Sequence, residues 1–360
     1  MNEGFRWCPH CGKPHALTER MCTATGKALD NAINQRSMAR PRTPLKPVLS
    51  PLIGTVLDGK YRILRAIGSG GMGTVFEAEN LALKRLVAVK VVTKPDSEEA
   101  LLRLAREASI VSSIQHPNIC DVYDVGVLPS GGPYLVMERL VGSTLDERVR
   151  TPRGMSISAI LDIFVQVLSG LHAAHVAQIL HRDIKPQNVF IVERLGCAPL
   201  VKIVDFGLAR DLAATSAARR LTKPGRLCGT LQYMSPEQLR GEVLDQRSDL
   251  FSVGVLLYET LTGRHPFAAP TSVELQTNIL RFDARPLREL RPDVPVALEE
   301  MVAWAMRRPS GERPSSAIEL QRGLLGAMRQ HSIVSPREDE WEPASVTNPI
   351  WVPPSSSPAA

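Results

Sequence analysis

The stretch that decides the fold reads HRDIKPQNVFIVERLGCAPLVKIVDFG and spans residues 181–207. Two apolar runs within it, VFIV and VKIV, have strand character, so we expect each polar motif to lie on a loop beside a strand, where a rigid scaffold can aim it. Asp183 and Asn188 share the first loop, and Asp205 follows the second strand. Together with the Lys185 ammonium, these residues place two carboxylates and an amide within reach of a single polyphosphate.

The three motifs resemble the catalytic core of the eukaryotic-type (Hanks-type) protein kinases, where H-R-D is followed by Asn and then by D-F-G. The resemblance implies that Asp183 accepts or orients the substrate hydroxyl proton, while Asn188 and Asp205 hold Mg²⁺. Lys185 favours the serine/threonine class over the tyrosine kinases, and Thr230 resembles the threonine that contacts the catalytic aspartate and lysine. The implied catalytic residues are Asp183, Lys185, Asn188, Asp205 and Thr230.

A glycine-rich segment, YRILRAIGSGGMGTVFEAEN at residues 61–80, has strand patterning on both sides of its glycines. Glycines let a backbone approach phosphates closely. A dinucleotide-binding loop has the same G-x-G-x-x-G spacing, but it predicts a helix directly after the third glycine. Because VFEAEN continues as a strand pattern, we favour the kinase loop.

Lys90, in the VAVK of the next predicted strand, has the position of the kinase lysine that pairs with the ATP phosphates. Its partner must come from the amphipathic helix that follows. Glu107 is the favoured candidate. Glu98 and Glu99 are alternatives, but they stand in the first turn, where acidic residues favour the helix dipole.

The resemblance covers about residues 57–328 and implies an α+β, bilobal fold with ATP between the lobes. The small lobe is a mostly antiparallel sheet with one helix, and the large lobe is helical. Met137 is expected at the back of the adenine pocket, with residues 138–140 as the hinge. Residues 142–145 are expected to open the following helix. The residues expected to contact ATP are Ile67, Gly68, Ser69, Gly70, Gly71, Met72, Gly73, Thr74, Val75, Ala88, Lys90, Glu107, Met137, Glu138, Leu140 and Phe190.

Three more positions resemble structural residues of the family. Ser235-Pro236-Glu237 stands where the family has Ala-Pro-Glu. Asp249 resembles the buried aspartate that tethers the catalytic-loop backbone, and Arg313 resembles the arginine that pairs with Glu237.

Residues 7–29 resemble an incomplete zinc ribbon. A CxxC knuckle lets two thiolates share one tetrahedral zinc, and a third cysteine follows. Thr25 stands where a fourth ligand would be, although a neutral imidazole could replace it. The alternative is a decayed ribbon that binds no metal. The candidate zinc ligands are Cys8, Cys11, Cys22 and either His10 or His15.

Flanking segments carry little periodicity. Residues 30–56 read as a Pro-rich, basic linker, and residues 329–360 as a disordered Pro/Ser-rich tail.

A net charge of +6 does not predict nucleic-acid binding, because aromatics are only 5% and no basic stretch is interleaved with stacking residues. The most apolar window, 161–180, contains Asp162 and His172, which favours a buried helix over a membrane span. With no apolar leader pattern, we expect a cytoplasmic protein.

The sequence therefore predicts a serine/threonine kinase that phosphorylates proteins, including itself, in bacterial signal transduction. A pseudokinase scaffold usually lacks one of its catalytic residues, and none is missing here: Lys90, Asp183, Asn188 and Asp205 are all present. A metal-binding adaptor would need the short ribbon to be the main functional element.

Regulation is expected at Arg182, since kinases with an arginine before the catalytic aspartate are commonly activated by phosphorylation of the activation loop. Thr222 is the favoured phosphorylation site, modified in trans by transient self-association. It lies eight residues before Thr230, whereas the position four before is Arg226. The alternative is that Arg226 blocks this switch and the loop is controlled otherwise.

Overall fold

The computed structural model describes residues 5–7, 14–16, 21, 52–70, 73–92, 108–129, 131–149, 155–194, 197–206, 231–282 and 284–330. The chain divides into two compact units, Met1–Ser50 and Pro51–Ala360. In the first unit, strands β1 (Phe5–Trp7) and β2 (Pro14–Ala16) form an antiparallel hairpin.

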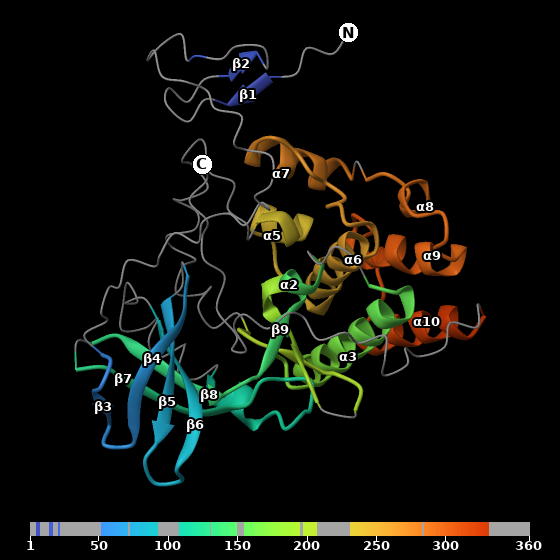
Figure 1. Cartoon of the computed structure of the whole chain (residues 1–360). Helices are drawn as coiled ribbons and strands as arrows, with labels where there is room; N and C mark the ends of the chain where they lie inside the picture. The colour runs from blue at the N-terminus through green and yellow to red at the C-terminus, as the bar shows by residue number, and fades with distance from the viewer. Residues whose placement is uncertain are drawn as a thin grey trace. The chain divides into compact units, whose positions relative to one another are not determined.

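The second unit begins with a six-stranded antiparallel sheet (Figure 1). Residues 52–57, assigned from the sequence largely to the linker, belong to it, because strand β3 pairs with β4 and Gly54 N–H donates to Ile63 O at 2.8 Å. The sheet order is β3-β4-β5-β6-β8-β7. The strands are β3 (Val56–Leu57), β4 (Tyr61–Gly70), β5 (Gly73–Asn80), β6 (Arg85–Val92), β7 (Val122–Val127) and β8 (Pro133–Glu138).

Side-chain alternation along the strands gives this sheet two apolar faces. On β6, Val87 and Val89 pack into the cluster on one face, while Ala88 and Val92 pack on the other. Successive residues of a strand point to opposite faces, so a strand buried on both sides reads as a continuous apolar run. The segment VAVKVV has this pattern, and Lys90 lies on the same face as Ala88.

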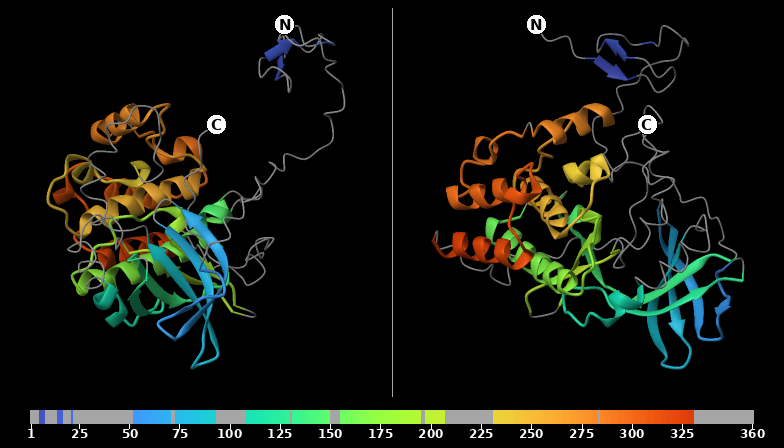
Figure 2. Two further views of the ribbon diagram at one scale, coloured as in Figure 1. Left: turned by 90° about the vertical axis from the view of Figure 1, so that its left-hand side faces the viewer. Right: turned by 180° about the vertical axis from the view of Figure 1, so that it is seen from behind.

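The helical half of the second unit is shown from two further sides in Figure 2. The segment 142–145, expected to open a helix, instead contains a short strand, and the helix begins only at Leu145. The helices are α2 (Leu145–Val149), α3 (Ile157–Val176), α5 (Pro236–Arg240), α6 (Gln246–Thr262), α7 (Ser272–Arg281), α8 (Leu287–Leu290), α9 (Val296–Ala305) and α10 (Ala317–Gln330), with short 3₁₀ turns η1 (Pro186–Asn188), η2 (Leu231–Tyr233) and η3 (Ser310–Glu312).

Helix α3 is the buried helix that the apolar window predicts. Ser156 caps its N-terminus by accepting from Ala159 N–H, and the helix packs against α10, α6 and strand β11. Among the described helices it alone is long and apolar enough to cross a membrane, and more than half of its apolar window is buried within the protein. Fully burying each of its Leu, Ile or Phe side chains contributes about 1.5–3 kcal/mol to folding.

Helix α6 is buried over nearly its whole circumference, and its buried side chains include four polar ones: Ser248, Asp249, Ser252 and Thr260. Asp245 caps its start, and Gly263 ends it in the left-handed conformation at φ 69°. A helix buried all round can hold polar groups only where they are hydrogen-bonded.

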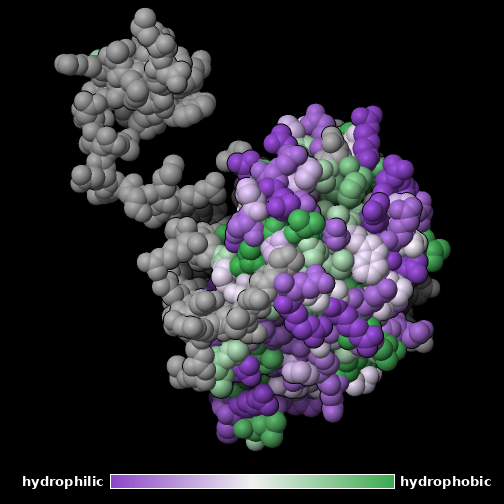
Figure 3. Space-filling view, turned by 90° about the vertical axis from the view of Figure 1, so that its right-hand side faces the viewer, coloured by the Kyte–Doolittle hydropathy of each residue, from purple (hydrophilic) through white to green (hydrophobic). Residues whose placement is uncertain are grey.

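On the outer face drawn in Figure 3, hydrophilic side chains cover much of the helical half, with smaller hydrophobic areas between them.

The two polar motifs lie next to strands of a three-stranded sheet. Its order is β11-β10-β9, all antiparallel. Its strands are β9 (Gly142–Thr144), β10 (Val189–Val192) and β11 (Leu200–Ile203). The two polar motifs therefore precede β10 and follow β11, as the apolar runs predict.

Candidate active site

The two halves of the second unit meet at an ion pair. Lys90 Nζ, from the centre of β6, lies 2.6 Å from Asp205 Oδ1, just after β11. Both side chains are largely buried, with 4% and 11% of their surface exposed. Asp205 has a left-handed backbone at φ 56°, an uncommon conformation for a residue with a side chain. The D-F-G aspartate and the VAVK lysine are therefore brought together from 115 positions apart.

The catalytic loop holds a second charged group. Lys185 Nζ donates to Asp183 Oδ2 at 2.7 Å, and Asn188 Nδ2 donates to the Asp183 carbonyl at 2.8 Å. Asn188 Oδ1 is buried and accepts no hydrogen bond from any residue in the described parts of the chain. A buried acceptor without a donor is costly, so this oxygen is poised for a ligand.

Asp249, in the first turn of α6, fixes the backbone of this loop. Its two carboxylate oxygens accept from His181 N–H at 2.8 Å and from Arg182 N–H at 2.7 Å. His175 Nε2 lies 2.8 Å from the same carboxylate. Burial works to raise the pKa of Asp249, but the hydrogen bonds and the neighbouring histidines outweigh it and lower the pKa. The predicted tether by Asp249 is confirmed.

His181 is buried in its neutral form. Its Nδ1 accepts from Asp183 N–H at 3.2 Å, and its Nε2 donates to the Val204 carbonyl at 3.1 Å. Burial lowers the pKa of His181. The ring thus links the residue before Asp205 to the backbone of Asp183, and it helps to hold the two motifs in register.

An apolar cluster extends from the sheet to the helical half and is called the interlobe cluster here. It joins β4, β5, β6 and β8 to residues on or after β10 and β11. Its buried members are Ile67, Val75, Ala88, Val92, Ala108, Cys120, Leu135, Met137, Leu140, Phe190 and Val204. Every apolar side chain that the sequence assigns to the adenine pocket lies in this cluster, apart from Met72, which lies outside the described residues.

The glycine-rich segment forms the hairpin β4–β5. Gly68 pairs with Val75, and Ser69 pairs with Thr74. Gly73 has φ 143°, and a Cβ there would lie 2.0 Å from Val91 O, so no other residue fits this close approach. The third glycine therefore begins a strand, which excludes the helix that a dinucleotide-binding loop requires.

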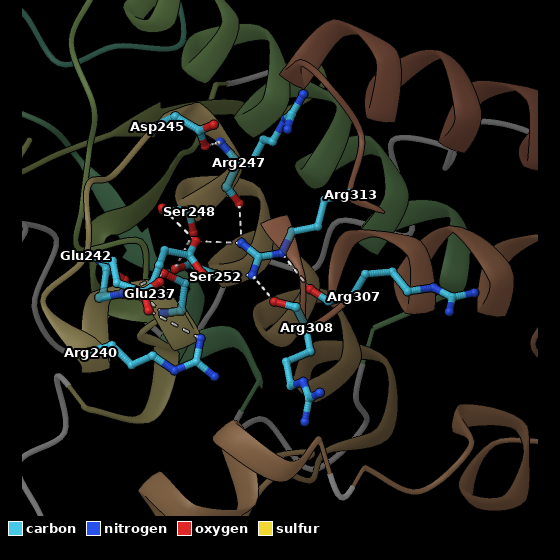
Figure 4. Close-up of polar contacts among 12 residues, drawn as sticks. Glu237, Arg240, Glu242, Asp245, Arg247, Ser248, Ser252, Arg307, Arg308 and Arg313 are labelled. Carbon is cyan, nitrogen blue, oxygen red and sulfur yellow. Dashed lines mark hydrogen bonds and ion pairs between the residues drawn. The ribbon is translucent and has the colours of Figure 1, made fainter. Parts of the chain in front are cut away.

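A buried ion pair anchors helix α5 in the helical half (Figure 4). Arg313 donates from both terminal nitrogens to Glu237, at 2.6 and 2.9 Å, and Ser248 Oγ adds a bond of 2.7 Å. The guanidinium also donates to three carbonyls and lies over the Phe251 ring at 4.9 Å. The predicted pairing of Arg313 with Glu237 is confirmed. The three carbonyls belong to Arg307, Arg247 and Arg308.

Comparison with known proteins agrees with this arrangement. Residues 61–325 match the protein kinase domain family. The chain belongs to the protein kinase family. The kinase domain of Mycobacterium tuberculosis PknI has the same fold, with a TM-score of 0.60 and 23% sequence identity, over 76% of this chain and 98% of that one.

Among similar kinases, the serine/threonine-protein kinase pkn3 of Myxococcus xanthus is 38% identical over 275 residues, covering 75% of this chain and 50% of the relative. Pkn1 of the same organism is 36% identical, covering 92% and 47%, respectively. PrkC of Bacillus subtilis is 34% identical, covering 77% and 42%. The chain thus spans about half the length of these curated relatives, or less.

Kinases use ATP and magnesium, and the residues present fit a magnesium ion. Mg²⁺ prefers oxygen ligands. Asn188 offers the buried Oδ1 that has no donor among the described residues, and the Asp205 carboxylate follows β11 on the other motif. The donor set is therefore suited to a hard cation beside the phosphates.

Residues 138 and 139, which the sequence assigns to the hinge, make ion pairs that sequence reasoning missed. Lys202 Nζ, on β11, lies 2.5 Å from Glu138 Oε1. Glu77 Oε1 accepts from Arg139 Nε at 2.5 Å, and Glu77 Oε2 accepts from Arg65 Nε at 2.7 Å. The only indication in the sequence is that Lys202 and Glu77 stand in otherwise apolar strand segments, where a charged side chain needs a partner.

Several predicted site residues lie outside the described part of the chain. The favoured Lys90 partner, Glu107, is one of them, so that pairing stays a prediction. For His15, on β2, the backbone alone is described. The others are Gly71 and Met72 of the glycine-rich loop, Thr230, Thr222 and the candidate zinc ligands Cys8, His10, Cys11 and Cys22.

Proposed function

We propose that this chain transfers the γ-phosphate of ATP to serine and threonine hydroxyls of protein substrates. The observation that supports it most is the Lys90–Asp205 pair beside the Asp183–Lys185–Asn188 group. Phosphoryl transfer needs positioning and charge neutralisation more than covalent catalysis. The relatives named above are serine/threonine kinases, which favours the same hydroxyl substrates here.

In the proposed reaction, the substrate hydroxyl oxygen attacks the γ-phosphorus as the bond to ADP breaks. Asp183 orients the hydroxyl and accepts its proton, and the adjacent Lys185 ammonium offsets charge on the phosphoryl group. Lys90 pairs with the ATP phosphates. Asn188 and Asp205 would hold Mg²⁺, which neutralises phosphate charge when it is bound.

A direct assay tests this function. Purified chain with Mg²⁺ and γ-labelled ATP should label itself or a generic acceptor protein on serine or threonine. A pseudokinase would instead bind MgATP, as seen by a thermal shift, without transferring label. The second outcome would contradict the proposed activity while leaving the fold intact.

We also propose that the N-terminal module binds one zinc ion through Cys8, Cys11, Cys22 and a histidine, His10 or His15. Purified protein never exposed to chelator should then contain about one equivalent of zinc. Cys11→Ser should lower the zinc content to well under half an equivalent, because a thiolate ligand is lost. Cys197→Ser, at an exposed cysteine of the second unit, is the matched control. Metal analysis below a tenth of an equivalent in the parent protein would favour the decayed ribbon.

Phosphorylation of Thr222 in trans is the proposed switch, with Arg182 as the partner of the phosphate. A phosphothreonine forms one to three charge-assisted hydrogen bonds, so Thr222→Ala should lower activity about tenfold or more. Mass spectrometry of autophosphorylated protein should find the modification. Thr215→Ala, which changes a threonine farther upstream in the same loop sequence, should keep full activity. Full activity in Thr222→Ala would mean that the loop is controlled otherwise.

A further inference from the structure

The backbone just before the catalytic aspartate is held at both of its polar groups. Arg182 has a left-handed backbone at φ 62°, which is uncommon for a residue with a side chain and costs about 1–3 kcal/mol. Its N–H donates to Asp249 Oδ1 at 2.7 Å. Its carbonyl accepts from Gln238 Nε2 at 2.9 Å. Asp183 therefore follows a strained residue that other elements hold in place from two sides.

The amide of Gln238 has only one workable orientation. Its Oε1 accepts from Ser235 N–H at 2.9 Å, and the backbone N–H of Gln238 donates to Ser235 Oγ at 3.3 Å, which completes a capping box at the start of α5. Because Oε1 must face the donor at Ser235, Nε2 must face the acceptor at Arg182. One side chain thus satisfies the helix end and the catalytic loop together.

Helix α5 gives this side chain a fixed base. Its second residue, Glu237, is 7% exposed and is held by Arg313 and Ser248 in the network of Figure 4. Ser235, at the helix start, is fully buried. Two adjacent residues of α5 are therefore held from opposite directions: Glu237 bonds to Arg313, and Gln238 bonds to Arg182.

We propose that Gln238 is a positioning residue for the phosphoryl-transfer step. It fixes the Arg182 carbonyl, and through that peptide the direction of the Asp183 side chain. Residues 231–240, which follow the activation loop in the sequence, are thereby coupled to the catalytic loop. This inference rests on the proposed kinase function.

Gln238→Glu separates the two roles of this side chain. Glutamate serves a capping box as well as glutamine, so Ser235 N–H keeps its acceptor. The donor to Arg182 O is lost, and a carboxylate oxygen faces that carbonyl instead. At pH 8 we expect kcat to fall about tenfold, equivalent to about 1.4 kcal/mol in the barrier, with the KM for ATP within twofold and Tm lowered by only a few degrees.

Gln246→Glu is the matched control, since Gln246 Nε2 also donates to a backbone carbonyl, that of Ser315, at 2.5 Å. Its side chain bonds to Ser315 and not to the catalytic loop, so kcat should not change. Hydrogen exchange gives a readout without activity: peptides covering 181–185 should exchange faster in Gln238→Glu and not in Gln246→Glu.

The proposal fails if Gln238→Glu keeps parental kcat and parental exchange in these peptides. It also fails if activity and Tm fall in parallel, as a purely structural role predicts. A parent chain that transfers no phosphate would instead contradict the proposed function, and the exchange experiment would still decide whether Gln238 holds the loop.

Discussion

Asp183→Asn should lower kcat for phosphoryl transfer by about 10²- to 10⁴-fold, since positioned acid–base groups contribute effects of this size. That loss corresponds to about 2.7–5.5 kcal/mol in the barrier. The physical reason is the loss of the carboxylate that accepts the hydroxyl proton. Folding should be preserved, because an asparagine Oδ1 can still accept from Lys185 Nζ, which now lies 2.7 Å from Asp183 Oδ2.

Two comparisons make the result specific to the reacting group. Thermal stabilisation by MgATP should persist in Asp183→Asn, because the Lys90–Asp205 pair is untouched. Asp293→Asn is the matched control: its side chain is 65% exposed and its nearest ion pair is long, at 3.5 Å, so kcat should not change. Steady-state assays on all three proteins decide the matter. Near-parental turnover in pure Asp183→Asn would remove Asp183 from the mechanism.

Much of the site follows from local sequence patterns that carry their own physical constraints. The runs VFIV and VKIVDFG predict strands next to the two motifs, and β10 and β11 lie there. Resemblance to kinases predicts the partners of Asp249 and Arg313, and both are confirmed. These contacts come with recognisable motifs, so a single sequence is enough to anticipate them.

Other contacts join positions whose local sequence gives no indication of a partner. Lys202 and Glu138 stand in unrelated strands, and Gln238 lies 56 residues from Arg182. Their pairing depends on tertiary proximity, which side-chain periodicity does not report. Ser235 is a related case, since it reads as a small departure from alanine, yet its hydroxyl and N–H complete a capping box.

Local patterns also misassigned one short element. Residues 142–144 read as the start of a helix, yet they form β9, paired with β10. Gly142 has φ 151°, and a Cβ there would lie 2.0 Å from Ile191 O. Three residues are too few to show strand periodicity, and the close backbone approach that needs this glycine is visible only once β10 is in place.

The largest effect on stability is expected at Arg313. Arg313→Met leaves the Glu237 carboxylate buried without its cation and removes the donor from three carbonyls. Removing one partner of a buried ion pair costs about 3–5 kcal/mol, equivalent to a fall in Tm on the order of 10 °C. Urea unfolding and calorimetry measure both quantities. Arg307→Met is the matched control, because this exposed arginine offers the network its backbone carbonyl alone, and it should stay within about 0.5 kcal/mol of the parent.

The pH dependence of the stability loss in Arg313→Met tests whether the charge on the Glu237 carboxylate causes that loss. Burial works to raise the pKa of Glu237, but the hydrogen bonds and charge of Arg313 outweigh it and lower the pKa below its ordinary value of 4.5. A carboxylate whose pKa is lowered by folding contributes stability above pH 4.5, and loses it as the pH falls through the folded-state pKa. The difference in unfolding free energy between the parent and Arg313→Met should therefore be largest at neutral pH and shrink in acid.

Adding Glu237→Leu to Arg313→Met should recover part of the loss at pH 7, because the uncompensated charge is gone. A double variant no more stable than Arg313→Met would mean that lost packing, rather than the buried carboxylate, dominates the cost.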